Sequence, residues 1–307
     1  MYSTYSNCRK LTGSPVCTNN TTDMYGTYYN CFNLTGSPVC GANTTNLMST
    51  YYQCYNLTGS PVCGNKVTSL YWTYYYCRNL TGSPVCGTRV TSMQEAYYEC
   101  ANITGSPVCG ANVTSMAHAY DGCKSLTGSP ACGNKVYDMR YTYRNCRNLT
   151  GSPVFGPNVS IIAGAYSGCW NLVGSPICPA SITDMSETYD GCNHLTGIAY
   201  CESNVKYLYR TYAGCTNIGA NAYFNSKLVT NAYGCFEGKN NSKRLNIYVP
   251  SGSNTNTRFA YNNRYSIVGA NIAWYKADDF SYYYNTEYNI YVYPVSNVAA
   301  ARAANGD

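Results

Sequence analysis

The sequence has 307 residues, a net charge of +6, only 11% charged residues, 36 tyrosines and 19 cysteines. Its lysines and arginines are scattered and form no basic stripe, so no nucleic-acid partner is expected. No run of about 18 apolar residues exists, and Met1 is followed by polar residues and tyrosines where a signal peptide would be charged and then apolar. We therefore expect no membrane insertion.

The chain is built from repeats of 23 residues. A first column of cysteines keeps this spacing: Cys8, Cys31, Cys54, Cys77, Cys100, Cys123, Cys146, Cys169, Cys192 and Cys215. A tyrosine stands three residues before each cysteine, and a long apolar residue stands four residues before the tyrosine. Spacing i, i+4, i+7 marks one face of a helix, so each repeat is predicted to contain a short helix. The core ladder on this face is expected to include Tyr28, Tyr51, Tyr74, Tyr97, Tyr120, Cys31, Cys54, Cys77, Cys100 and Cys123.

Each repeat also carries a helix-start signal and an extended segment. Asp23, Asn46 and Ser69 precede the apolar residue, where a side-chain oxygen can cap free amides. Beyond the cysteine runs Leu-Thr-Gly-Ser-Pro-Val-Cys, whose proline cannot donate to a strand ladder, so the strand must be short. A unit of this size cannot enclose a core, and stacked neighbours must supply the missing face. The predicted fold is an α/β repeat solenoid of about ten coils, each a short strand plus a short helix.

The repeat unit resembles that of a known family. The run VTSMAHAYDGCKSLTG, residues 113–128, is similar to the V-T-x-M-x-x-x-F-x-x-C-x-x-L unit of BspA-like leucine-rich repeat surface proteins, with Tyr120 in place of phenylalanine. The resemblance covers about residues 1–218 and departs from the family where Gly-Ser-Pro-Val-Cys replaces an apolar strand. It implies a right-handed leucine-rich-repeat solenoid, often displayed on bacterial cells as an adhesin. Similar tyrosine-rich repeats occur in structural proteins of gut bacteriophages.

The cysteines allow two interpretations. Eleven lie in the first column, counting Cys235, but only eight lie in a second column such as Cys40 and Cys63, and Phe155 stands where another is due. This mismatch favours reduced, buried thiols over the alternative of a disulfide framework. The spacings of nine or fourteen residues lack the close pairs that bind zinc, so no metal is expected.

Catalytic residues are not apparent in the sequence. The two histidines, His118 and His194, occupy different repeat positions and cannot stack into one site. Acidic residues are sporadic. We therefore predict that the chain is not an enzyme and has no cofactor.

Two surface columns have possible roles. Asparagines two residues after the first-column cysteine, including Asn33, Asn56, Asn79 and Asn217, suggest a ladder that bonds successive coils. The candidate binding surface is an aromatic stripe next to the core tyrosines, whose alternative explanation is packing between coils. The aromatic stripe consists of Tyr29, Tyr52, Tyr71, Trp72, Tyr75, Tyr76 and Tyr98.

The C-terminal region departs from the repeat. The runs LNIYVPSGS from Leu245 and YNIYVYPVS from Tyr288 are predicted strands of a β-rich cap, which divides the chain into a solenoid at 1–235 and a cap at 236–307. At the other end Met1 occupies the apolar repeat position, so the chain starts inside a repeat. We expect the uncapped N-terminal face to be a contact for a homo-oligomer or filament, or else a truncation point.

Two classes of function remain open. The first is an extracellular or virion-surface recognition protein that adheres to a glycan or protein receptor. The second is a structural protein whose copies polymerise into, or decorate, a fibre or particle. Many unpaired cysteines and the polar start favour assembly in a reducing cytoplasm followed by release, as for a virion protein.

Overall fold

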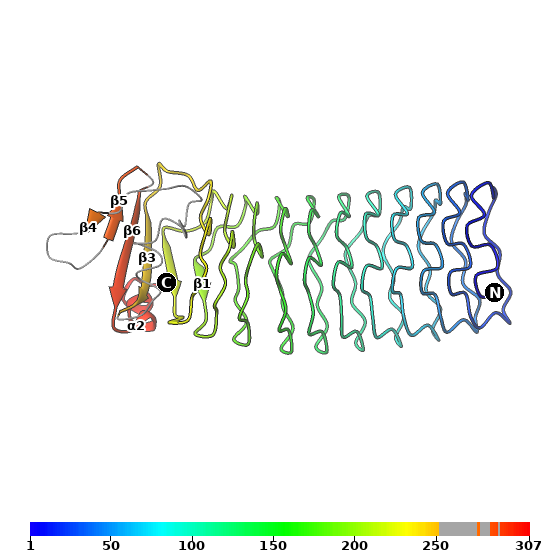
Figure 1. The fold of residues 1–307 in the computed structure, drawn as a ribbon, viewed down its shortest axis with the longest axis horizontal. Helices are drawn as coiled ribbons and strands as arrows, with labels where there is room; N and C mark the ends of the chain where they lie inside the picture. The colour runs from blue at the N-terminus through cyan, green and yellow to red at the C-terminus, as the bar shows by residue number, and fades with distance from the viewer. Residues whose placement is uncertain (252–274, 277–282, 288) are drawn as a thin grey trace. The chain divides into compact units, whose positions relative to one another are not determined.

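The computed structural model describes residues 1–251, 275–276, 283–287 and 289–307. Its contacts divide the chain into two compact units, Met1–Val159 and Ser160–Asp307. In each unit the repeats form coils that lie side by side, and Figure 1 shows those of the first unit in blue to green. The predicted boundary at residue 235 falls inside the second unit, between two strands that pair with each other.

Backbone hydrogen bonds join each coil to the next. The amide of Met24 donates to the carbonyl of Asn46 at 3.0 Å, and the amide of Tyr28 donates to the carbonyl of Thr50 at 2.9 Å. Alternate residues repeat this bond along the segment between the apolar residue and the cysteine. The intervening amides turn back within the coil, as Cys31 does to the carbonyl of Tyr28 at 3.1 Å. The backbone of this segment is thereby paired without a helix.

The predicted helix of each repeat is wrong, although the buried face is correct. Residues 24–31 form successive turns, in which Gly26 and Asn30 have positive φ angles of 54° and 59°. Left-handed residues interrupt a right-handed helix, and the amides that would bond four residues back pair with the next coil instead. Met24, Tyr28 and Cys31 still point inward, since each is at most 1% exposed.

The predicted capping residues start these turns. The Oδ1 atom of Asp23 accepts from the amide of Tyr25 at 2.8 Å, and Asn46 and Ser69 accept from the residue two positions on in the same way. Such a bond closes a local turn. The same residues form single parallel bridges from coil to coil, as between Asp23 and Asn46.

Stacked tyrosines fill the centre of the coils. Tyr51 and Tyr74 are fully buried, and their ring centroids lie 5.6 Å apart at an interplanar angle of 6°. The Tyr51 hydroxyl crosses its own coil, where it accepts from the amide of Val39 at 2.9 Å and donates to its carbonyl at 2.7 Å. The Cys54 thiol donates to the carbonyl of Tyr28 in the preceding coil at 3.1 Å. All ten residues of the predicted core ladder are buried.

The recurrent proline of the repeat coincides with the absence of a strand at that repeat position in the part of the chain that the structure describes. In the first unit Gly-Ser-Pro-Val-Cys segments contain no strand among the described residues. In the second unit Ala199 takes the place of proline, and β1 (Ala199–Cys201) forms and pairs in parallel with β2 (Asn221–Phe224). Because alanine restores the amide that proline lacks, a ladder can extend through this position.

The sheet continues into the C-terminal region. Its order is β1-β2-β3-β6-β5-β4, with β3 (Leu245–Pro250), β4 (Tyr275–Lys276), β5 (Tyr283–Asn285) and β6 (Ile290–Val295). The parallel pair β3 and β6 confirms the two predicted strands, although Tyr288 lies outside the described residues. Helix α2 (Val298–Ala304) follows, with the Asn297 side chain accepting from the amide of Ala300 at its start.

Candidate functional site

The aromatic stripe is a second stack of rings on the coil surface. Tyr29 and Tyr52 have centroids 4.6 Å apart, Tyr52 and Tyr75 also 4.6 Å, and Tyr75 and Tyr98 4.7 Å, with interplanar angles of 9° or less. All four rings are half-buried, whereas the core tyrosine beside each one is buried. The stripe therefore packs between coils and also contacts solvent.

Trp72 widens the stripe at its centre. Its ring stacks on that of Tyr71, with centroids 4.4 Å apart, and meets Tyr75 edge-on at 6.4 Å. Trp72 has a φ of 56°, a left-handed conformation that tryptophan rarely adopts. The indole Nε1 is buried and has no hydrogen-bond partner. Such an orphaned donor is costly to bury and is typical of functional surfaces.

Burial favours the neutral form of four phenols of the stripe, those of Tyr52, Tyr71, Tyr75 and Tyr98. Burial raises the pKa of Tyr75, and the neighbouring phenols of Tyr52 and Tyr98 raise it further. The pKa values of Tyr52, Tyr71 and Tyr98 are raised as well, with burial as the main cause in each case. These four phenols can therefore donate hydrogen bonds and offer apolar area without carrying charge.

An open groove of about 610 Å³ lies beside the stripe, lined by Gln53, Tyr55, Asn56, Tyr76, Arg78 and Asn79. Tyr76 belongs to both surfaces, because its ring meets that of Tyr75 edge-on at 4.9 Å. The volume falls within the usual range for small-molecule sites. The groove lining has amides, phenols and one guanidinium group but no carboxylate.

A column of rings and guanidinium groups reaches the groove, at the position directly after the first four first-column cysteines. Tyr55 and Arg78 line the groove, and Phe32 and Arg9 continue the column toward the first coil. Phe32 and Tyr55 stack at 5.1 Å, the Arg9 guanidinium lies 5.4 Å from the Phe32 ring, and the Arg78 guanidinium lies 5.9 Å from the Tyr55 ring. The sequence interpretation missed this column, because its residue type changes from coil to coil. The sequence did contain a signal for this column, because only cations and aromatic residues occupy this repeat position in the first four repeats: Arg9, Phe32, Tyr55 and Arg78.

The asparagine ladder is only partly formed. Asn33 donates to the carbonyl of Arg9 at 2.9 Å, and Asn217 donates to the carbonyl of Asn193 at 2.9 Å. Asn56 and Asn79, which line the groove, are exposed and make no such bond within the described chain. Their amides are available to a ligand.

The stripe ends in a charged cluster. Asp121 is 1% exposed and follows Tyr98 in the same repeat position. Its carboxylate pairs with Arg144 at 2.7 Å and with Nδ1 of His118 at 2.9 Å. The tyrosine stack therefore gives way at this position to a charged network around a buried carboxylate.

The cysteines carry thiols and form no disulfides. Burial raises the pKa of first-column thiols such as Cys54 well above the ordinary range, and it raises the pKa of Cys63 in the second column to about 12. Thiolates, the nucleophilic form, are therefore suppressed. Across the described residues no three His, Cys, Asp or Glu side chains are grouped to hold a metal ion.

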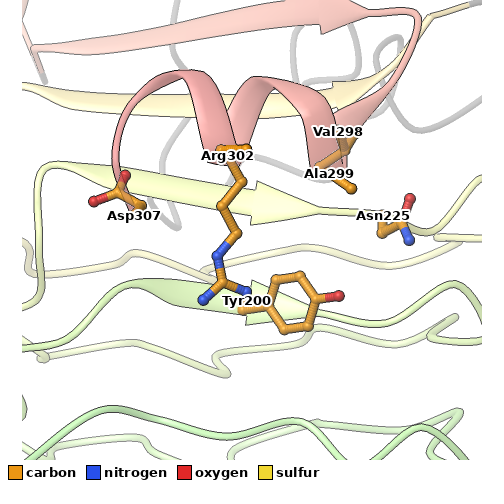
Figure 2. A pocket seen from close by; sticks show the side chains of 7 residues that line it. Tyr200, Asn225, Val298, Ala299, Arg302 and Asp307 are labelled. Atoms are coloured by element: carbon orange, nitrogen blue, oxygen red, sulfur yellow. The ribbon is translucent and has the colours of Figure 1, made fainter.

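A separate cavity of about 170 Å³ lies in the second unit (Figure 2). Arg302 extends from α2 toward Tyr200, and its guanidinium lies 5.0 Å from the ring centroid. Asp307 accepts from the Tyr223 hydroxyl at 2.6 Å and from the Asn221 amide at 2.7 Å, and these bonds lower the pKa of its carboxyl group. No sequence pattern pointed to this cavity.

Stacked coils define the chain as a repeat protein. No family model and no curated protein matches its sequence. Among solved structures it is distantly similar to a leucine rich cell surface protein from Faecalibacterium prausnitzii A2-165, at 15% identity and a TM-score of 0.31, over 71% of this chain and 81% of that chain. None of the helices within the described residues is long and apolar enough to cross a membrane.

Proposed function

We propose that the chain is a non-enzymatic recognition protein of the leucine-rich-repeat type, displayed on a cell or virion surface, that binds glycan or protein through the aromatic stripe. One observation carries the proposal. Four stacked, half-exposed tyrosines meet, through Tyr76, an open groove whose amides lack partners in the described chain. Tyrosine and tryptophan offer large rigid contact areas with polar tips, and they dominate binding surfaces.

The orphaned Trp72 donor supports the same conclusion. A buried indole nitrogen without a partner weakens the free protein and gains a hydrogen bond when an acceptor arrives. The raised thiol pKa values and the lack of a metal-binding group in the described chain agree with a binding role more than with a catalytic one.

The proposal can be tested with the Trp72→Ser, Tyr75→Ser double variant. Its binding to a glycan array and to bacterial cells should fall by tenfold or more, because two central aromatic contacts are lost. Tyr209→Ser is the matched control, since Tyr209 also stacks on a ring of the next coil but lies in the second unit. Unchanged binding by the double variant, with a stability loss far beyond that of the control, would show that the stripe only packs.

The second candidate is a structural protein that associates through its first coil. The amides of Ser3, Tyr5 and Asn7 donate to carbonyls of the second coil, but the carbonyls of Tyr2 and Thr4 accept no backbone bond within the described chain. Exposed edges of this kind pair with other chains. Light scattering over a concentration series would decide: growth into long assemblies favours this candidate, and a monomer at high concentration opposes it.

A further inference from the structure

We infer that the groove beside the stripe, together with the exposed column that continues from it, binds an acidic polysaccharide, whose carboxylate or sulfate groups pair with Arg78 in the groove lining and with Arg9 in the column. The inference rests on the proposed recognition function and assigns a ligand class to it.

The two guanidinium groups are held by rings and have no acidic partner among the residues that the structure describes. Arg78 lies 4.8 Å from the Tyr76 ring centroid and 5.9 Å from that of Tyr55, while Arg9 lies 5.4 Å from that of Phe32. Stacking engages the face of a guanidinium group and leaves its N–H edge available for planar anions.

Other arginines of the chain show the contrast. Arg140 pairs with Asp138 at 2.7 Å, Arg144 with Asp121 at 2.7 Å and Arg210 with Asp190 at 3.0 Å. Arg9 and Arg78 are exposed and form no ion pair with any described carboxylate. A ligand carboxylate or sulfate would supply the bidentate partner that these side chains lack.

The neutral part of the groove suits hydroxyl groups. Gln53, Asn56 and Asn79 offer amide donors and acceptors, and Tyr55 and Tyr76 offer phenols. Both faces of Tyr55 are already covered, by Phe32 and by Arg78, so the rings orient the cations more than they stack on sugars. A guanidinium group surrounded by amides and phenols fits an acidic sugar better than an apolar ligand.

The spacing of the cations favours a polymer. Arg9 and Arg78 stand three coils apart in one column, which corresponds to roughly 14 Å at the usual spacing of neighbouring chains. Lys10, which is exposed, adds a third positive charge in the adjacent column. One chain with regularly spaced anions can reach both guanidinium groups, and the second contact then forms at high effective concentration.

The test compares polygalacturonate with its fully methyl-esterified form, and dextran sulfate with dextran, by biolayer interferometry. The intact chain should bind the acidic member of at least one pair tenfold or more tightly than the neutral member, and the preference should weaken as salt rises. Whether the carboxylate pair or the sulfate pair shows the preference identifies the anion.

Three variants complete the test. Arg9→Gln with Arg78→Gln should remove the preference, whereas Arg89→Gln, an exposed arginine elsewhere in the repeat, should retain it. Equal binding of acidic and neutral forms would overturn the inference and leave the proposed function in place. A second outcome would also overturn the inference: the Trp72→Ser, Tyr75→Ser double variant loses all binding, and the intact chain shows no preference for the acidic polysaccharide. Equally tight binding of polyglutamate through the same two arginines would overturn it in favour of an acidic protein partner.

Discussion

Tyr74 and Tyr75 are neighbours in the sequence, repeat with the same period and stack on rings of adjacent coils, yet they differ in nearly every other respect. Tyr74 is fully buried, and its hydroxyl is bonded to the amide and carbonyl of Val62 at 3.0 and 2.7 Å. Tyr75 is half-exposed and borders the groove through Tyr76. The tyrosine column that contains Tyr74 holds each coil closed, whereas the tyrosine column that contains Tyr75 supplies a surface. Stacking alone therefore does not reveal the role of a tyrosine.

Alkali should produce the largest effect, because it acts on the buried column as a whole. Burial raises the pKa of Tyr74 above its ordinary 10.0 and that of Cys77 above its ordinary 9.0. The unfolded chain loses these protons at lower pH than the folded chain, so their stabilising contribution is complete below pH 9 and declines as pH rises further. Above its ordinary pKa and below its raised pKa in the folded chain, each group lowers the free energy of unfolding by about 1.4 kcal/mol for each unit that the pH rises.

Urea unfolding between pH 7 and 11 measures this decline. Tyr74→Phe removes one titrating group and should reduce the slope. Tyr75→Phe should reduce it less, because the half-exposed Tyr75 phenol is partly solvated in the folded chain. A free energy of unfolding that stays constant through pH 11 would contradict the assignment of a protonated, buried column.

Truncation separates the two columns directly. Tyr74→Ala should cost about 3–5 kcal/mol of unfolding free energy, since it leaves a cavity in the core. Tyr75→Ala should cost about 1 kcal/mol, the usual value of an aromatic pair at a surface. Chemical denaturation of both variants provides the comparison, and equal losses would mean that the stripe is part of the core.

Glycine-to-alanine substitutions should also report on the close stacking of the coils. Gly82 has a φ of 76°, and a Cβ there would lie 2.2 Å from the Ser60 hydroxyl of the preceding coil. Gly82→Ala should cost about 2 kcal/mol or more, from backbone strain together with the clash. At Gly13 the φ is 86° and no atom lies within 4 Å, so Gly13→Ala isolates the backbone part, about 1 kcal/mol. A similar thermal shift for both variants would indicate that the coils can move apart.

The smallest effect concerns the buried hydroxyl. Tyr74→Phe leaves the Val62 amide and carbonyl without their partner and should cost about 1–3 kcal/mol at neutral pH, whereas Tyr75→Phe should cost almost nothing. Thermal unfolding at pH 7 compares the two. A stability loss at Tyr75 as large as that at Tyr74 would require a buried partner for the Tyr75 hydroxyl.

The sequence predicted which side chains are buried better than it predicted the backbone conformation. The 23-residue period identified Met24, Tyr28 and Cys31 as buried, because burial depends on which side chains recur. It did not predict the turns, since spacing i, i+4, i+7 is satisfied both by a helix and by alternating left-handed residues. Trp72 and Glu95 hold left-handed positions, with φ values of 56° and 53°, although only glycine commonly marks such a position in a sequence. Hydrogen bonds to the next coil stabilise that backbone, and they do not appear in a single repeat.

The candidate site was predicted in part. Tyr52 and Tyr75 were predicted because each directly follows a core tyrosine, so that aromatic residues recur at this position in successive repeats. The groove was missed because the residue type at this repeat position changes from Arg9 through Phe32 and Tyr55 to Arg78, so no single side chain recurs there.

Hydroxyl-radical footprinting with mass spectrometry tests the division between the two columns most directly. In the free protein Tyr75 and Trp72 should be oxidised and Tyr74 should be spared. Saturating polygalacturonate or dextran sulfate should then protect Tyr75, Tyr76 and Trp72 without changing Tyr209 in the second unit. Equal oxidation of Tyr74 and Tyr75, or ligand protection confined to residues 160–307, would contradict the account.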